Sequence, residues 1–373
     1  MYIWQQTDWP RFRWDGAALQ PRLDAVRLLQ RRLLGKSEGQ PEDTDRQAQM
    51  DALVQSAIRT SEIEGENLDV ESVRSSVARH LGLEKAGMGP PTRQADALVE
   101  LLLEATRDYS EVLTLRTLLN WQSALFTEPS VLNQVNPGQL RGDTPMQVVS
   151  GRIDRPVIHF EAPPRAGLEE EVEQFLHWFN HSPKNLNALL RAGIAHLWLV
   201  TLHPFEDGNG RVARAVTDRA LAQAEQQSVR FYSLSAAIMA RRKEYYLQLE
   251  RAQKGGLDIT PWLEWFLSVL EDALQQGLIR LVRVMQKTRF WRSHAQTVLS
   301  ERQIKVLNRL LDSAAAEGGE AEEFPDGINA RKYMSMAKVS KATATRELAD
   351  LLEKSCLRKL PGGGRSTRYE LDL

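Results

Sequence analysis

The segment HPFEDGNGRVAR, from His203 to Arg214, brings together groups that act on phosphates. It holds a histidine, two acids, two glycines around an asparagine, and two arginines three residues apart. Charged side chains are costly to bury unpaired and glycines weaken a helix, so stability alone does not explain this composition. We expect a buried helix to end near Phe205 and another to begin near Asn209. The loop EDGNG would then lie at a helix N-terminus, where free backbone amides and the helix dipole attract anions.

The glycines and arginines of this segment suit a phosphate ligand. Gly208 and Gly210 let the backbone approach a ligand without Cβ collisions. Arg211 and Arg214 project along neighbouring faces of the new helix and are able to grip successive phosphates.

Asp207 and His203 add the remaining parts of a reaction. Asp207 offers a hard oxygen ligand to a magnesium ion that bridges the phosphates. His203, at the end of the preceding helix, is able to take a proton near neutral pH. The segment therefore predicts a phosphoryl- or nucleotidyl-transfer site.

This constellation resembles the motif of the Fic family, H-x-F-x-D/E-G-N-G-R-x-x-R. Every specified position of the motif is met in this chain, by His203, Phe205, Asp207, Gly208, Asn209, Gly210, Arg211 and Arg214. The resemblance implies a protein adenylyltransferase, which moves AMP from ATP to a Ser, Thr or Tyr hydroxyl of a protein while diphosphate leaves. Self-modification is expected as well.

The same resemblance implies a role for each motif residue. His203 would be the general base, Asp207 would hold Mg²⁺, and Asn209 with the loop amides would cradle the α-phosphate. Arg211 and Arg214 would hold the β- and γ-phosphates. The side chain of the motif phenylalanine would anchor the loop in the core.

The resemblance extends over roughly residues 1–290. The β-prone runs MQVVS and PVIHF predict a hairpin at about Met146–Phe160, which resembles the family's flap for an extended target segment. Tyr245 and Tyr246 resemble the pair that lines the adenine pocket, and Gln253 stands where the family contacts the base or ribose. The alternative for the tyrosine pair is ordinary core packing.

A second motif, TSEIEG at Thr60–Gly65, resembles the family's inhibitory helix motif S/T-x-x-x-E-G/N. Helical spacing of the apolar residues before it predicts a helix that ends near Glu64, with Gly65 as its terminator. A carboxylate in the last turn of a helix faces the negative end of the dipole, so Glu64 needs a cation. We predict that this cation is Arg214, which would then be unavailable to the γ-phosphate. The alternative is a solvated acid at a helix end.

The last 80 or so residues predict a helix, an acidic loop, two or three short helices and two strands, which is the order of a winged helix. The segment KVSKATATRELADLLEK resembles the helix-turn-helix of winged-helix repressors. Its candidate DNA contacts lie on a recognition helix and on the wing: Lys338, Lys341, Thr343, Arg346, Arg365, Ser366 and Arg368. The alternative is a module for protein interaction or dimerisation.

Composition sets the outer bounds. The chain has 373 residues, with 48 basic against 49 acidic, so net charge argues for neither a nucleic-acid nor a membrane partner. A single cysteine, Cys356, and the lack of an apolar run of about 20 residues predict a cytoplasmic protein outside the membrane. We expect a mainly α fold: an N-terminal helical region over 1–90, a Fic catalytic domain with a β-hairpin flap over 91–290, and a winged helix over 295–373.

Several functions remain open at this stage. Some members of the family transfer phosphocholine or UMP, and one branch phosphorylates its target with a loop in which the two glycines are replaced. Both glycines are present here, which favours nucleotidyl transfer. The alternative of a different class is a nucleotide-sensing, DNA-binding transcriptional regulator. The sequence leaves the target and the oligomeric state, homodimer included, undecided.

Overall fold

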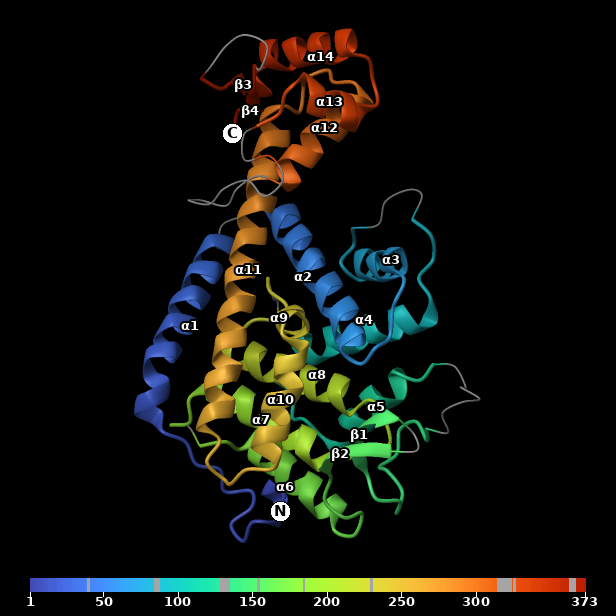
Figure 1. The fold of residues 1–373 in the computed structure, drawn as a ribbon, viewed down its shortest axis with the longest axis vertical. Coiled ribbons are helices and arrows are strands. Elements are labelled where there is room, and N and C mark those ends of the chain that lie inside the picture. The colour runs from blue at the N-terminus through green and yellow to red at the C-terminus, as the bar shows by residue number, and fades with distance from the viewer. Residues whose placement is uncertain are drawn as a thin grey trace. The chain divides into compact units, whose positions relative to one another are not determined.

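The computed structural model describes most of the chain: residues 1–38, 41–83, 88–127, 135–152, 155–183, 185–228, 231–313, 324, 327–361 and 367–373. The fold is mainly helical, as predicted (Figure 1). Arg365 and Ser366 of the predicted wing, and most of the predicted acidic loop, lie outside the described residues.

The first half of the chain contains these elements: a short 3₁₀ helix at Ile3–Gln5, α1 (Gly16–Ser37), α2 (Glu42–Ile63), α3 (Val70–His80), α4 (Arg93–Arg107), α5 (Leu115–Ala124), β1 (Gln147–Arg152), β2 (Arg155–Glu161) and α6 (Leu168–Asn180). The second half contains α7 (Ala188–Leu202), α8 (Asn209–Glu225), α9 (Leu234–Ala240), α10 (Arg242–Gln253), α11 (Thr260–Ser293), α12 (Glu301–Asp312), α13 (Ala330–Ala337), α14 (Lys341–Glu353), β3 (Leu357–Lys359) and β4 (Tyr369–Leu371).

The chain divides into two compact units. One contains residues 1–38 and 49–277, and the other contains residues 39–48 and 278–373. Most of the predicted N-terminal region thus shares a unit with the predicted catalytic region, because α4 packs against α3 and also against α8. The three domain boundaries that we expected stay a prediction.

Helices α7 and α8 form the centre of the first unit. In α7 every residue except Ala188 and Arg191 is buried, as expected of a helix that is apolar on all sides. Helix α8 is buried from Asn209 to Ala222 except at Gly210, although it carries arginines and an aspartate. The tight packing of α7 extends to α11, where Trp262 donates to the Gly193 carbonyl at 2.9 Å. The loop between α7 and α8 is therefore held by two anchored helices.

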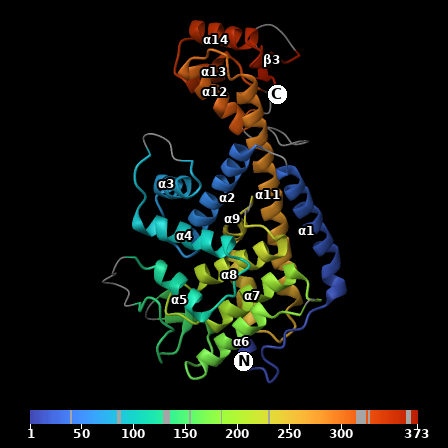
Figure 2. The same ribbon diagram turned by 180° about the vertical axis from the view of Figure 1, so that it is seen from behind.

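The predicted hairpin is present. Strands β1 and β2 pair antiparallel, with Val148 opposite Phe160 and a bulge between Val148 and Val149. Within the described part of the chain, this sheet contains β1 and β2 and no further strand. Figure 2, which views the molecule from behind, shows helices α5, α6, α7 and α8 of this unit.

The second unit has its own core. Helices α12, α13 and α14 and the antiparallel strands β3 and β4, orange to red in Figure 1, enclose a cluster centred on Val306, Leu307, Ile328, Tyr333 and Leu351. This order of helices and strands is the order that we expected, and the assignment as a winged helix stays a prediction. Among the described residues, no helix combines the length and the apolar character needed to cross a membrane.

Candidate functional site

His203 lies at the C-terminal cap of α7, in the left-handed region of backbone space with φ 48°. Its Nδ1 lies 3.3 Å from the Val200 carbonyl oxygen. A carbonyl only accepts hydrogen bonds, so Nδ1 carries the proton and Nε2 is left as an acceptor. Burial lowers the pKa of His203, and the charge of Arg141 lowers it further, which outweighs the opposing carbonyl and acids. The ring is therefore neutral near pH 7, as a general base must be.

The loop after His203 is fixed by hydrogen bonds within it. The Asn209 side chain accepts from the Phe205 amide at 2.9 Å and donates to the Phe205 carbonyl at 2.8 Å. The Phe205 ring is fully buried, as the anchoring role predicted. Both the oxygen and the nitrogen of the Asn209 side-chain amide are therefore hydrogen-bonded within the loop, and Asn209 fixes the loop's shape in this structure. Its contact with the α-phosphate stays a prediction.

Asp207 and Gly208 form the start of α8. Gly208 is the N-cap residue with φ +87°, a conformation that favours glycine, and its amide donates to Oδ1 of Asp207 at 2.6 Å. The Asp207 carboxylate is thereby held at the helix N-terminus. One carboxylate together with the phosphates of a nucleotide fits the ligand set that Mg²⁺ uses in such sites. Asp207 would hold the ion, which would neutralise phosphate charge.

Two residues from outside the motif donate hydrogen bonds to backbone carbonyls of the loop. Arg141, almost fully buried, donates through Nε to the His203 carbonyl at 2.9 Å and through Nη2 to the Pro163 carbonyl at 2.5 Å. Gln122 of α5 donates to the Asp207 carbonyl at 3.2 Å. We did not predict either contact, because a buried arginine or glutamine carries no local signal of its distant partner.

Arg214 is buried and bound to the end of α2. Its Nη2 donates to Oε1 of Glu64 at 2.7 Å, which is the ion pair that we predicted. Its Nε also donates to the Thr60 hydroxyl at 2.7 Å, and Nη2 to the Thr60 carbonyl at 2.9 Å. Burial by itself lowers the pKa of Arg214, but the Glu64 carboxylate reverses this, and the pKa is raised. The guanidinium therefore stays charged in the core.

Arg211 has a partner that sequence reasoning missed. Its Nη1 donates to Oε2 of Glu66 at 2.7 Å, and its guanidinium lies 5.6 Å from the centre of the Phe126 ring. The Arg211 side chain is only 3 % exposed. Glu66 lies two residues beyond the motif glutamate, and its position after a terminating glycine was the available signal.

Each of the two arginines has an N–H group without an acceptor among the described residues. Arg211 Nε and Arg214 Nη1 are buried and make no hydrogen bond within the part of the chain that the structure describes. Buried N–H groups are costly without an acceptor, so these two favour an anion in the site.

Gly210 allows the close approach between Glu64 and α8. A Cβ atom at this position would lie 2.2 Å from Oε1 of Glu64 and 3.1 Å from Nη1 of Arg214. The Glu64 carboxylate therefore occupies the space directly above the second glycine of the loop.

The residues predicted for the adenine pocket differ in exposure. Tyr245 is buried, its hydroxyl lies 2.9 Å from Nε2 of His196, and burial raises its pKa. Gln253 is also buried and donates to the Thr201 hydroxyl at 3.4 Å. Tyr246 is 37 % exposed and donates to the Ile63 carbonyl at 3.0 Å. Tyr245 and Gln253 thus serve the core here, and adenine contact by all three residues stays a prediction.

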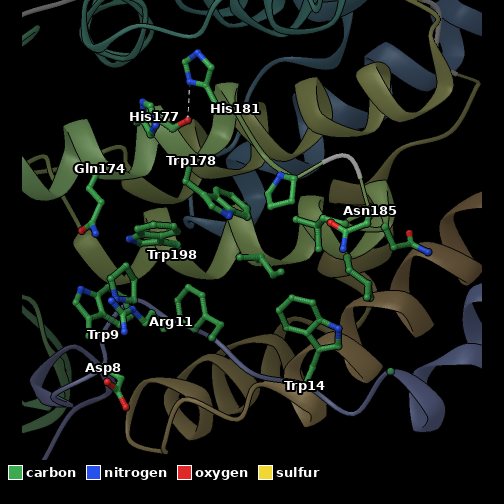
Figure 3. A pocket seen from close by; sticks show the side chains of 18 of the residues that line it. Asp8, Trp9, Arg11, Trp14, Gln174, His177, Trp178, His181, Asn185 and Trp198 are labelled. Atoms are coloured by element: carbon green, nitrogen blue, oxygen red, sulfur yellow. Dashed lines mark hydrogen bonds between the residues drawn. The ribbon is translucent and has the colours of Figure 1, made fainter.

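A cavity of about 1080 Å³ lies elsewhere in this unit, between the N-terminal segment and α6 and α7 (Figure 3). Trp9 and Trp198, which both line it, make an edge-to-face contact with ring centres 6.2 Å apart, and Trp9 donates to Glu171 at 3.0 Å. None of the residues that line this cavity belongs to the motif. Its aromatic walls tie the N-terminal segment to the central helices.

The loop, the histidine and the arginines lie within a part of the chain that is similar to known proteins. Residues 112–221 form a domain of the Fic/DOC family, and residues 2–83 match a domain of unknown function, DUF4172. The chain is 33 % identical over 114 residues to protein adenylyltransferase Fic of Drosophila mojavensis and 31 % identical over 108 residues to protein adenylyltransferase fic-1 of Caenorhabditis elegans. These alignments span 30 % and 29 % of this chain but only 21 % and 20 % of the relatives.

Solved structures support the fold over a longer stretch. A Fic family protein from Desulfovibrio desulfuricans aligns over 96 % of both chains with a TM-score of 0.53 and 18 % identity. Fic-1 from Caenorhabditis elegans aligns over 73 % of this chain and 75 % of its own, with a TM-score of 0.52 and 19 % identity. At these identities the likeness concerns the fold alone.

Proposed function

We propose that the chain is a protein adenylyltransferase that moves AMP from ATP to a Ser, Thr or Tyr hydroxyl of a protein, itself included. The observation that carries the proposal is a pair of buried arginines at the start of α8, each with an N–H that lacks an acceptor among the described residues. They stand beside the N-terminus of a helix and a neutral histidine. The names of the matched relatives point the same way.

The reaction requires one proton acceptor and firm positioning. The hydroxyl oxygen of the target attacks the α-phosphorus of ATP, its proton passes to Nε2 of His203, and the bond to the β-phosphate bridging oxygen breaks so that diphosphate leaves. Arg211 and Arg214 bind the β- and γ-phosphates and stabilise the charge of the leaving group. The backbone amides of Asn209 and Gly210, in the first turn of α8, face the α-phosphate.

The resting site is closed in this proposal. The Glu64 carboxylate forms an ion pair with the guanidinium of Arg214, and it also fills the space next to Gly210. A triphosphate that approaches meets a carboxylate where its own negative charge should bind, so the γ-phosphate is unable to reach its cation. We therefore propose that α2 acts as an inhibitory helix.

A labelling experiment tests the reaction. The Glu64→Gly variant of the full chain is incubated with MgATP that carries its radiolabel on either the α- or the γ-phosphate. We expect the α-label alone to enter protein and no label in the Glu64→Gly, His203→Ala double variant. Incorporation of the γ-label would indicate phosphorylation instead, and label from UTP but not from ATP would indicate UMP transfer.

A second function is proposed for the C-terminal unit, in which α14 acts as a recognition helix of a winged helix that binds DNA. Lys338, Lys341 and Arg346 are exposed in and before this helix, which favours contact with phosphates. Binding of the full chain to duplex DNA should weaken steeply as salt rises. Binding that does not respond to salt, or no binding, would favour a protein-interaction module.

A further inference from the structure

The end of α2 is a Schellman turn that points two carboxylates at α8. The Gly65 amide bonds the Glu62 carbonyl and the Glu66 amide bonds the Ser61 carbonyl, both at 3.0 Å. Gly65 takes φ +86°, which reverses the chain and returns Glu66 toward the end of its own helix. Glu64 and Glu66, on either side of this glycine, thus reach the same neighbouring helix.

Each carboxylate holds a different arginine. Glu64 pairs with Arg214 and Glu66 pairs with Arg211, both with N–O distances of 2.7 Å. The two pairs have the same character, since the arginine side chains are 2–3 % exposed and the carboxylates are 30 % and 36 % exposed. A pair with one partner buried is screened by water less than a surface pair. Glu66 therefore competes for Arg211 as Glu64 competes for Arg214.

We infer that Glu66 is a second inhibitory carboxylate, which guards the phosphate position of Arg211 independently of Glu64. The inference rests on the proposed function, because it takes a nucleotide triphosphate as the ligand of the two arginines. Loss of Glu64 alone frees only Arg214. A phosphate oxygen that binds Nη1 of Arg211 must still displace Glu66.

Further contacts hold the segment from Thr60 to Glu66 against its neighbours. Arg242 Nε at 2.7 Å and the Tyr246 hydroxyl at 3.0 Å both donate to the Ile63 carbonyl, in addition to the two ion pairs. Release of the last turn of α2 thus breaks contacts with α8 and α10 together. Removal of one carboxylate loosens this segment without freeing both arginines.

Binding and transfer measurements on one set of variants test the inference. Affinity for MgATP is measured by calorimetry in the His203→Ala background, which prevents turnover, and AMP transfer is measured with His203 present. The set contains Glu64→Gly, Glu66→Gln, the two combined, and Glu62→Gln as the matched control. Glu62 carries the same charge on the same turn but pairs with Arg59 at 2.5 Å.

We expect the double variant to bind MgATP about fivefold more tightly than Glu64→Gly, as expected from relief of one such pair. Glu62→Gln should bind as the parent does. Equal affinity of Glu64→Gly and the double variant would overturn the role of Glu66. If affinity rises in the expected order but no variant transfers AMP, the proposed reaction fails while Glu66 still guards the phosphate site. If Glu64→Gly transfers AMP and Glu66→Gln adds nothing to binding, the further inference alone fails.

Discussion

Two clusters of buried charge, one in each compact unit, are paired differently. In the first, Arg211 and Arg214 are buried yet keep N–H groups without an acceptor among the described residues, and their partners are half-buried acids on a helix end. In the second unit, Glu347 is buried and both its oxygens are used, one by Arg302 at 2.9 Å and one by the Tyr333 hydroxyl at 2.6 Å. The N–H groups of Arg211 and Arg214 that lack an acceptor allow these two side chains to bind a further partner, whereas the complete pairing of Glu347 is that of a structural contact.

The largest effect should come from the base in the first unit. His203→Ala removes the acceptor for the hydroxyl proton but leaves the loop and both arginines, so MgATP affinity should change little. AMP transfer in the Glu64→Gly background should fall by about 10² or more. Transfer at an unchanged rate, measured by intact-protein mass, would remove His203 from the mechanism.

In the second unit, loss of a hydrogen bond to the buried Glu347 should affect stability and not AMP transfer. Tyr333→Phe leaves one oxygen of the buried Glu347 carboxylate without its donor, which should lower the free energy of unfolding by about 1–3 kcal/mol. AMP transfer should not change. Urea unfolding and an AMP-transfer assay of the same variant measure the two effects. A loss of transfer at constant stability would contradict the structural role of this hydrogen bond.

The pH dependence of stability tests the burial of His196 in the core of the first unit. Burial, assisted by the charge of Arg214, lowers the pKa of His196 to about 3, so the folded state keeps this ring neutral. The unfolded chain takes up the proton near pH 6.5, so stability is complete above that pH and is lost as pH falls toward 3.

As the pH falls from about 7.5 to about 5.5, protonation of His196 in the unfolded chain should lower the free energy of unfolding by about 1.4 kcal/mol. The measurement is urea unfolding of the parent and of His196→Gln at both pH values, and the variant should show a shallower dependence. Identical dependence in the two proteins would assign the effect to other groups.

The smallest effect is expected on the surface of the second unit. Arg302 is 53 % exposed, so Arg302→Gln should lower stability by less than about 1 kcal/mol, although it removes the ion pair with Glu347. A loss as large as that of Tyr333→Phe would show that the charge, and not the buried hydroxyl, holds Glu347.

The sequence predicted those parts of the site that lie close together along the chain. The motif from His203 to Arg214 needs only two helices and the turn between them, so its spacing carries most of its geometry. The pairing of Glu64 with Arg214 was predicted from the resemblance of TSEIEG to the inhibitory motif, and the need of a carboxylate at a helix C-terminus for a cation supports it. The helical character and the hairpin followed from the periods of apolar residues and from turn residues.

What the sequence could not reveal depends on contacts between distant elements. Arg141 and Gln122 hold the loop from residues more than 60 positions away. Glu66 reaches Arg211 only because α2 ends beside α8, and Tyr245 is buried because its hydroxyl meets His196 of α7. In each case the residue type is ordinary and its partner is decided by packing.

The most direct test of the central claim is the rate of self-modification in the parent chain and in Glu64→Gly, measured side by side by intact-protein mass with MgATP. If Glu64 holds Arg214 away from the γ-phosphate, the variant should gain AMP at least about tenfold faster, which corresponds to relief of about 1.4 kcal/mol. The gain should vanish when His203→Ala is added. Equal rates in the parent and in Glu64→Gly would contradict the claim that this carboxylate closes the site.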